Sequence, residues 1–112
     1  MKLVTAVVKP DKLDDVIRAV EGAGARGLTA TEVMGFGQQY GHLGAVAPAD
    51  QSPLVLPKVR VDVLIRDELV GAIIDAIVKS VNTGSIGDGK IWVCPVESAL
   101  RVRTGERDND AV

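Results

Sequence analysis

The sequence predicts an α+β fold in which two helices cover one face of a four-stranded antiparallel sheet. Two observations predict it. Four short runs are rich in β-branched residues, and two longer runs repeat apolar residues at helical spacing. The runs follow one another in the order strand, helix, strand, strand, helix, strand. With right-handed crossovers, this order gives the ferredoxin-like βαββαβ sandwich.

The first half of the chain supplies two strands and one helix. The run from Leu3 to Val8 is predicted as a strand because it is β-branched and is stopped by Lys9 and Pro10. Asp11 is expected to cap the helix that follows. Thr29 to Phe36 is predicted as the second strand. The apolar positions of the helix fall on one face, and they are Leu13, Val16, Ile17, Val20 and Ala23.

The second half repeats this pattern. Apolar and polar residues alternate from Val59 to Ile65, which predicts a strand with one face in the core. Asp67 is expected to cap the second helix. Ile91 to Val96 is predicted as the last strand, with Pro95 at its end or at an unpaired edge position, and Cys94 as a buried, inert thiol. The apolar stripe of the second helix comprises Val70, Ile73, Ile74, Ile77, Val78 and Val81.

The face of the sheet without helices is expected to carry Leu64 and either Val4 or Val8. An exposed apolar surface of this kind usually marks a subunit interface. The sequence therefore predicts a homo-oligomer.

Composition restricts the class of protein. A chain of 112 residues suits one domain, and a net charge of -2 with a pI of about 5.3 argues against nucleic-acid or acidic-membrane partners. The one cysteine excludes a disulfide within the chain and fits a reducing compartment. No signal peptide or spanning segment is evident, so a soluble cytoplasmic protein is expected. One cysteine and one histidine cannot build a tetrahedral metal site without other subunits.

The segment from Thr83 to Val93 packs three glycines, an acid and a lysine into a loop that leads into an apolar strand. Glycine amides with no Cβ nearby, followed by a lysine, suit the binding of phosphate oxygens. The spacing differs from that of a P-loop, because neither Ser nor Thr follows Lys90. A simple tight turn between a helix and a strand is the alternative interpretation.

Two other segments do not fit the sandwich pattern. Gln38 to Pro57 lacks helical or strand periodicity, and we interpret it as a mobile functional arm, with an inconsequential insertion as the alternative. Arg101 and Arg103 are expected to project to one side of an extended C-terminal segment, 98–112, where their guanidinium groups suit phosphate. A solvated pair at a frayed end is the alternative.

As a set, these residues resemble the PII family of nitrogen-regulatory signal-transduction proteins, over nearly the whole chain. The resemblance rests on Met1 to Pro10, the Thr83 to Val93 loop, Arg101 to Glu106, and shorter matches between them. It implies a homotrimer with a nucleotide site in each cleft between neighbours, where ATP and ADP compete. With Mg-ATP bound, 2-oxoglutarate would bind beside the phosphates. The long loop would then control ammonium channels or nitrogen-metabolism enzymes.

The resemblance also implies roles for individual residues. Gln39 would ligate Mg²⁺, Lys58 would pair with a carboxylate of 2-oxoglutarate, and Gly87 would contact the same ligand. Arg101, Arg103 and Thr29 would come from the adjacent subunit. The implied nucleotide-binding residues are Val7, Thr29, Gly35, Gly37, Gln38, Asp62, Leu64, Ile86, Gly87, Asp88, Gly89, Lys90, Arg101 and Arg103.

Several positions depart from the family's pattern. Gln51 stands where many members have a tyrosine that is uridylylated, so this modification is not expected. Ala47 replaces the loop arginine that plugs ammonium channels, and Ala49 replaces a serine that some relatives phosphorylate. Gln38 replaces an arginine that commonly contacts the terminal phosphate, so a preference for ATP over ADP or AMP is expected to weaken.

The sequence therefore predicts a regulator that senses ATP or ADP, and 2-oxoglutarate, and that controls a transporter or a metabolic enzyme through its long loop. The alternative within the same fold is a sensor of ADP, AMP or bicarbonate that regulates a different transporter. An enzyme is a third hypothesis. It has little support, because the one histidine, His42, lies in the long loop and no Ser/His/Asp set is present.

Overall fold

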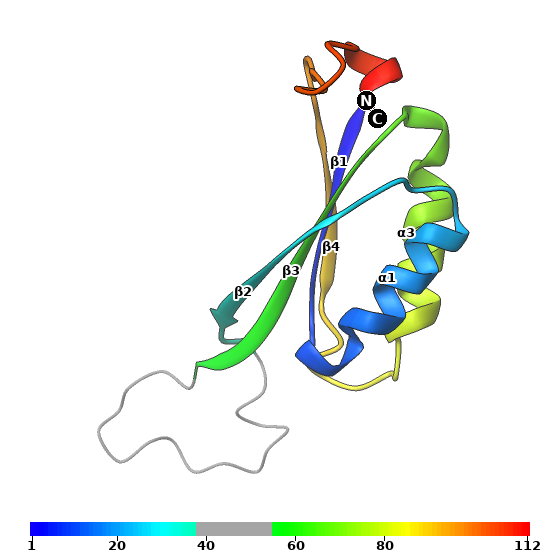
Figure 1. The fold of residues 1–112 in the computed structure, drawn as a ribbon. Coiled ribbons are helices and arrows are strands. Elements are labelled where there is room, and N and C mark those ends of the chain that lie inside the picture. The colour runs from blue at the N-terminus through cyan, green and yellow to red at the C-terminus, as the bar shows by residue number, and fades with distance from the viewer. Residues whose placement is uncertain (38–54) are drawn as a thin grey trace.

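A computed structural model describes residues 1–37 and 55–112. Its elements confirm the predicted order and the ferredoxin-like fold class, with both helices on one face of the sheet (Figure 1). The strands are β1 (Lys2–Val8), β2 (Thr29–Gly35), β3 (Leu56–Ile65) and β4 (Lys90–Pro95). The helices are α1 (Leu13–Gly22) and α3 (Val70–Val81), with short 3-10 turns η1 (Pro10–Lys12), η2 (Asp67–Leu69) and η3 (Asp108–Ala111).

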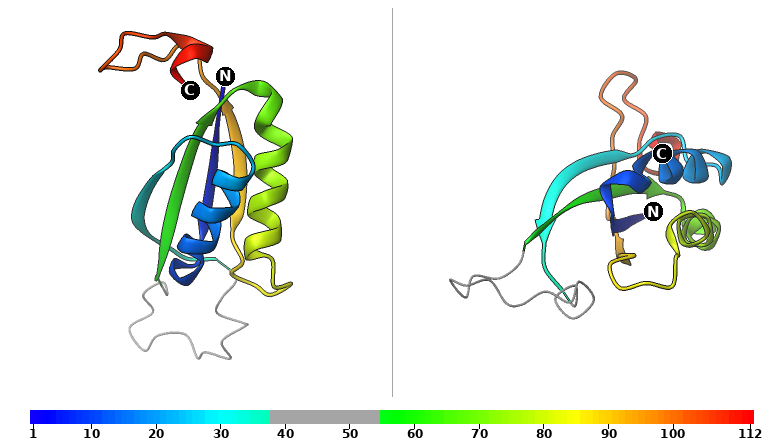
Figure 2. Two further views of the ribbon diagram at one scale, coloured as in Figure 1. Left: turned by 45° about the vertical axis from the view of Figure 1, so that its right-hand side comes forward. Right: turned by 90° about the horizontal axis from the view of Figure 1, so that it is seen from below.

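The sheet has the strand order β2-β3-β1-β4, and every neighbouring pair is antiparallel. β1 lies between β3 and β4, so Val4 has Val63 on one side and Val93 on the other. β4 is an edge strand that ends at Pro95, as predicted. Figure 2 shows β2 and the adjoining part of β3 curving away from the helices.

The core lies between the sheet and the two helices. Val4, Val61 and Val63 from the sheet are fully buried, as are Ile73 and Ile77 from α3. The prediction that Val4 or Val8 lies on the open face is wrong, since both belong to this core. Their strand alternates strictly, and Leu3, Thr5 and Val7 therefore take the open face, where Leu64 lies as predicted opposite Leu3.

Neither predicted aspartate caps a helix. Asp11 lies inside η1, and the side chain of the α1 N-cap residue, Lys12, forms no capping hydrogen bond. Asp67 begins η2, and its carboxylate pairs with the amino group of Met1 at 2.9 Å. This hydrogen bond lowers the pKa of Asp67. In both places a 3-10 turn precedes the helix, which moves the first helical residue beyond the reach of the aspartate.

Two further expectations need correction. Cys94 is exposed, because β4 is an edge strand and little of its surface is covered. The strand β3 also begins three residues earlier than predicted, at Leu56, since Leu56 and Pro57 pair with Gly35 and Met34. The unpatterned segment therefore ends before Pro57. None of the helices in the described parts of the chain combines the length and the apolar character needed to cross a membrane.

The replacement Ile77→Ala is expected to lower the free energy of unfolding by about 2–5 kcal/mol, because Ile77 is fully buried in the core. Val78→Ala on the same helix is the control, since Val78 is 40% exposed, and its cost is expected to be about 1 kcal/mol or less. Urea unfolding at one protein concentration measures both values. Equal costs would contradict the packing described for α3.

Candidate functional site

Two hollows lie at opposite ends of the open face and collect most of the predicted site residues. The first, which we call the loop hollow, has a volume of about 570 Å³ and is lined by Val7, 35–37, Lys58 and 85–90. The second, the hairpin hollow, has a volume of about 450 Å³. Its lining residues are Leu3, Arg26, Gly27, Leu28, Thr29, Asp62, Leu64, Arg101, Ala111 and Val112.

Lysine side chains surround the glycine at the centre of the loop hollow. Gly87 has a φ of +100°, and a Cβ placed there would lie 3.3 Å from Lys9 Cε and 3.7 Å from Lys58 Nζ. Lys58 is buried, and its ammonium group donates a hydrogen bond to the Gly87 carbonyl at 3.3 Å. Lys90 lines the same hollow. The loop hollow is thus a cationic concavity next to backbone without side chains, which suits an anion.

The carboxylate of Asp88 holds the loop in shape. It accepts hydrogen bonds from the backbone amides of Thr83 at 2.7 Å and Gly84 at 2.9 Å, and another from the Thr83 hydroxyl. The Lys9 ammonium group lies 3.7 Å from the same carboxylate. The hydrogen bonds from Thr83 lower the pKa of Asp88. The carboxylate is therefore occupied within the chain, and the backbone and Lys90 are left to face a ligand.

Gly89 is required for a contact with β1. Its φ is +116°, and a Cβ there would lie 2.1 Å from the carbonyl oxygen of Val7. Real Cβ atoms do not approach backbone so closely, so the loop rests on β1 only because position 89 has no side chain. This contact requires a glycine at position 89 whether or not a phosphate binds there.

The C-terminal segment forms a hairpin, and the prediction of an extended segment is wrong. Gly105 N donates to Arg101 O at 2.8 Å, Arg101 N donates to Glu106 O at 2.9 Å, and Leu100 bridges Arg107. Arg103 therefore lies in a turn rather than on a strand. The Arg101 guanidinium group pairs with Glu106 at 3.0 Å.

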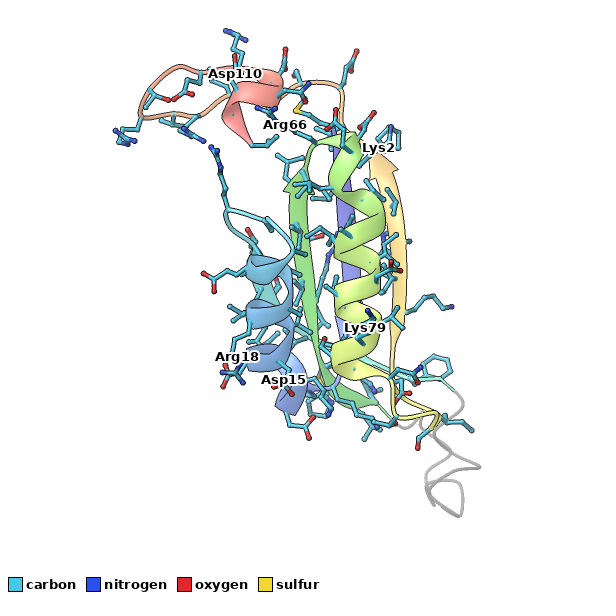
Figure 3. The ribbon with its side chains drawn as sticks, turned by 90° about the vertical axis from the view of Figure 1, so that its right-hand side faces the viewer. Lys2, Asp15, Arg18, Arg66, Lys79 and Asp110 are labelled. Atoms are coloured by element: carbon cyan, nitrogen blue, oxygen red, sulfur yellow. The ribbon has the colours of Figure 1, made fainter. Side chains whose placement is uncertain are left out.

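The hairpin is tied to the end of β3 through Arg66, which follows that strand. The Arg66 guanidinium group donates to the Asn109 carbonyl at 3.1 Å and lies 3.9 Å from the Asp110 carboxylate. Figure 3 shows Arg66 and Asp110 at the end of the molecule away from Asp15 and Arg18. Figure 1 shows the C-terminal hairpin and the 82–89 connection at opposite ends of the sheet.

Asp62 forms a polar cluster on the open face. Thr5 donates to its carboxylate at 2.7 Å, and Arg60 does so at 3.1 Å. The Arg60 guanidinium group also lies 5.9 Å from the centre of the Trp92 ring. Burial alone raises the pKa of Asp62, but the hydrogen bonds from Thr5 and Arg60 outweigh it, so the pKa of Asp62 is lowered.

The predicted site residues therefore divide into separate groups. Val7, Gly35, Gly37, Lys58 and the run from 86 to 90 share the loop hollow. Thr29, Asp62, Leu64 and Arg101 share the hairpin hollow, and Arg103 lines neither. On β1, Val7 lines the loop hollow and Leu3 lines the hairpin hollow. These two residues are four strand positions apart, a distance of about 13 Å along the strand. Gln38, Gln39 and Gln51 lie outside the described residues.

Sequence reasoning missed several residues at these sites, and four of them carry charge or belong to the loop hollow. Phe36 and Ser85 line the loop hollow, Lys9 approaches its central glycine, and Arg26 lines the hairpin hollow. Ser85 could have been found, because it belongs to the glycine-rich loop. For Arg26, the only feature of the sequence that could have indicated a site was the presence of glycines nearby. Within 1–37 and 55–112, no group of three or more His, Cys, Asp or Glu side chains could hold a metal ion.

The replacement Gly89→Ala is expected to destabilise the protein more than Gly84→Ala. Both glycines have positive φ, which costs an alanine about 1–2 kcal/mol, but only at position 89 does the new methyl group meet backbone. Thermal unfolding of the two variants measures the difference. Equal stability would show that the loop does not rest on β1 as described.

The replacement Asp88→Asn is expected to lower stability at neutral pH, because the amide loses the charge that the Thr83 donors and Lys9 stabilise. The pKa of Asp88 is lower in the folded chain than its usual 3.8, so its contribution is complete above that pH and disappears as pH falls through the folded value. Urea unfolding from about pH 7 to pH 3 should therefore show the difference from the unaltered protein shrinking in acid. A difference that stays constant would contradict this role.

Comparison with known proteins agrees with this architecture. A family model described as nitrogen regulatory protein P-II matches residues 1–106. The nitrogen regulatory protein P-II of Cereibacter sphaeroides and GlnK of Escherichia coli strain K12 are each 48% identical to this chain over 112 residues. The nitrogen regulatory protein P-II of Azospirillum brasilense is 46% identical, and all three matches cover 100% of both chains. Since the likeness extends over the whole length, this chain belongs to the P-II family of nitrogen regulatory proteins and is a regulator rather than an enzyme.

Proposed function

We propose that this protein is a homotrimeric sensor of ATP and ADP, and of 2-oxoglutarate. The observation that carries the proposal is the division of the predicted nucleotide-binding residues between two hollows at opposite ends of one open face. Within one chain these two groups of residues lie about 13 Å apart along β1. A site built from the loop hollow of one copy and the hairpin hollow of the next reunites these residues.

The loop hollow supplies one set of groups that would bind phosphates. Gly87 and Gly89 leave backbone uncovered, and Lys58 and Lys90 add positive charge. This donor set fits a polyphosphate and offers no carboxylate cluster for a metal among the described residues. Mg²⁺ would therefore arrive with the nucleotide, held by its phosphates and by the side-chain oxygen of Gln39.

Lys58 is the residue that would bind 2-oxoglutarate. Its ammonium group already donates a hydrogen bond to the Gly87 carbonyl, inside the loop hollow. A carboxylate of an oxo-acid placed there would add a charge-assisted partner to this lysine. Gln39 and Gly87 would complete the contacts.

The regulated partner would be a membrane transporter or an enzyme of nitrogen metabolism, contacted through the segment 38–57. Gln51 offers no hydroxyl group, so uridylylation at this position is not part of the proposed regulation. The cytoplasm is the proposed compartment, which suits a chain with one free cysteine. A sensor of ADP, AMP or bicarbonate for another transporter is the second candidate, and Gln38 favours it.

Calorimetric titration with Mg-ATP is expected to show binding that Lys90→Ala weakens by about 10- to 100-fold, because one charge-assisted contact is lost. Lys79→Ala is the matched control, since Lys79 is an exposed lysine on α3 outside both hollows. Titration with 2-oxoglutarate should then give heat only when Mg-ATP is present.

Two results would contradict the proposal in different ways. Absence of ATP and ADP binding would remove the nucleotide-sensing function. Equal binding of ATP, ADP and AMP, with no response to 2-oxoglutarate, would instead favour the second candidate.

A further inference from the structure

We infer that Arg26 is a further ligand-binding residue of the hairpin hollow, where it contacts a phosphate group of the bound nucleotide and raises selectivity for phosphorylated ligands. This inference rests on the proposed nucleotide site. It assigns a role to a residue that the sequence pattern did not single out.

Arg26 lies on a short connection whose ends are fixed. Ala25, next to it, is buried, and Ala25 N donates to Val20 O at 2.9 Å, at the end of α1. Thr29 begins β2 and pairs with Asp62 of β3. Because both ends of the connection belong to the rigid fold, the backbone at Arg26 is held at the rim of the hairpin hollow.

The other charged side chains of this hollow already have partners. The Asp62 carboxylate accepts hydrogen bonds from Thr5 and Arg60, which neutralise it without help from Arg26. Arg101 pairs with Glu106 at 3.0 Å and also donates to the Ala111 carbonyl at 3.4 Å.

Arg26 differs from both of these residues. It is exposed, and it forms no ion pair or side-chain hydrogen bond with any residue in the described ranges, 1–37 and 55–112. Its guanidinium donors are therefore without partners among these residues. An arginine offers a planar fork that matches two phosphate oxygens at once.

The hollow combines apolar surface with one arginine that has no partner among the described residues. Asp62 is neutralised by Arg60, and Arg101 by Glu106. The terminal carboxylate of Val112 lines the same hollow but forms no ion pair with Arg26, and Leu28 and Leu64 supply the apolar part of the lining. A nucleotide matches this combination, since it carries an apolar ring face and negatively charged phosphates. Uncharged adenosine would satisfy only the apolar part.

The test compares Arg26→Gln with the unaltered protein in titrations with Mg-ATP and with adenosine, the latter measured by displacement of ATP. Loss of one charge-assisted contact is expected to weaken ATP binding about tenfold or more and to leave adenosine binding unchanged. The loss should become smaller at high salt, because an exposed charge is screened. Arg26→Lys should restore part of the affinity.

Arg18→Gln is the matched control. Arg18 is also an exposed arginine, but it pairs with Asp15 on α1 and lies outside both hollows (Figure 3). Unchanged ATP affinity in Arg26→Gln would overturn the inference and leave the proposed function in place. Equal losses for ATP and adenosine would overturn it too, because Arg26 would then act on the base or the fold. Failure of the unaltered protein to bind ATP would overturn both the proposed function and this inference.

Discussion

The position of β1 between β3 and β4 determines which residues of the sheet face the core and which face the open side. Residues 2–7 of this strand each pair with one residue of β3 and one of β4, so the alternation of β1 is imposed on both neighbouring strands. Val4 and Ala6 face the helices and are fully buried, whereas Leu3 and Val7 reach the two hollows on the other face. A slip of one residue would exchange these faces, expose the core and remove both sites together. The fold and the candidate binding surface therefore depend on one register.

The two ends of the open face are stabilised in different ways. At one end, a glycine lies against the β1 backbone and an aspartate closes the loop with hydrogen bonds. At the other end, Arg66 and Arg101 fasten the C-terminal hairpin through ion pairs and carbonyl contacts on the surface. Exposed ion pairs contribute little and weaken with salt. The two ends thus rely on different interactions, and the hairpin end has charged groups that can exchange partners when a ligand binds.

The sequence was sufficient to predict the fold because its apolar periodicity is strong. The two helices and four strands follow directly from that periodicity, and the glycine loop was evident from composition. Details that depend on tertiary neighbours were not predictable. Asp11 and Asp67 look like caps, but the preceding 3-10 turns shift the helices away from them. Cys94 looks buried from its apolar neighbours, but the strand order puts β4 at an edge.

Prediction of the candidate site from the sequence was limited in the same way. The family resemblance placed Lys58 and Lys90 in one site, and both line the loop hollow. The sequence pattern could not show that Arg101 folds back onto Glu106, because a five-residue turn leaves little periodic signal. It also could not show that Arg26 joins the same hollow, since that depends on how α1 ends and β2 begins.

The Trp92 ring has a practical consequence. It is the one tryptophan of the chain, it is 38% exposed, and it lies against Arg60 on the open face. Indole emission shifts with the amount of water around the ring, and a neighbouring guanidinium group perturbs it further. The protein therefore carries its own optical reporter at the centre of the surface that we assign to assembly. Covering that surface with another copy, as in the proposed trimer, would change the fluorescence without any attached dye.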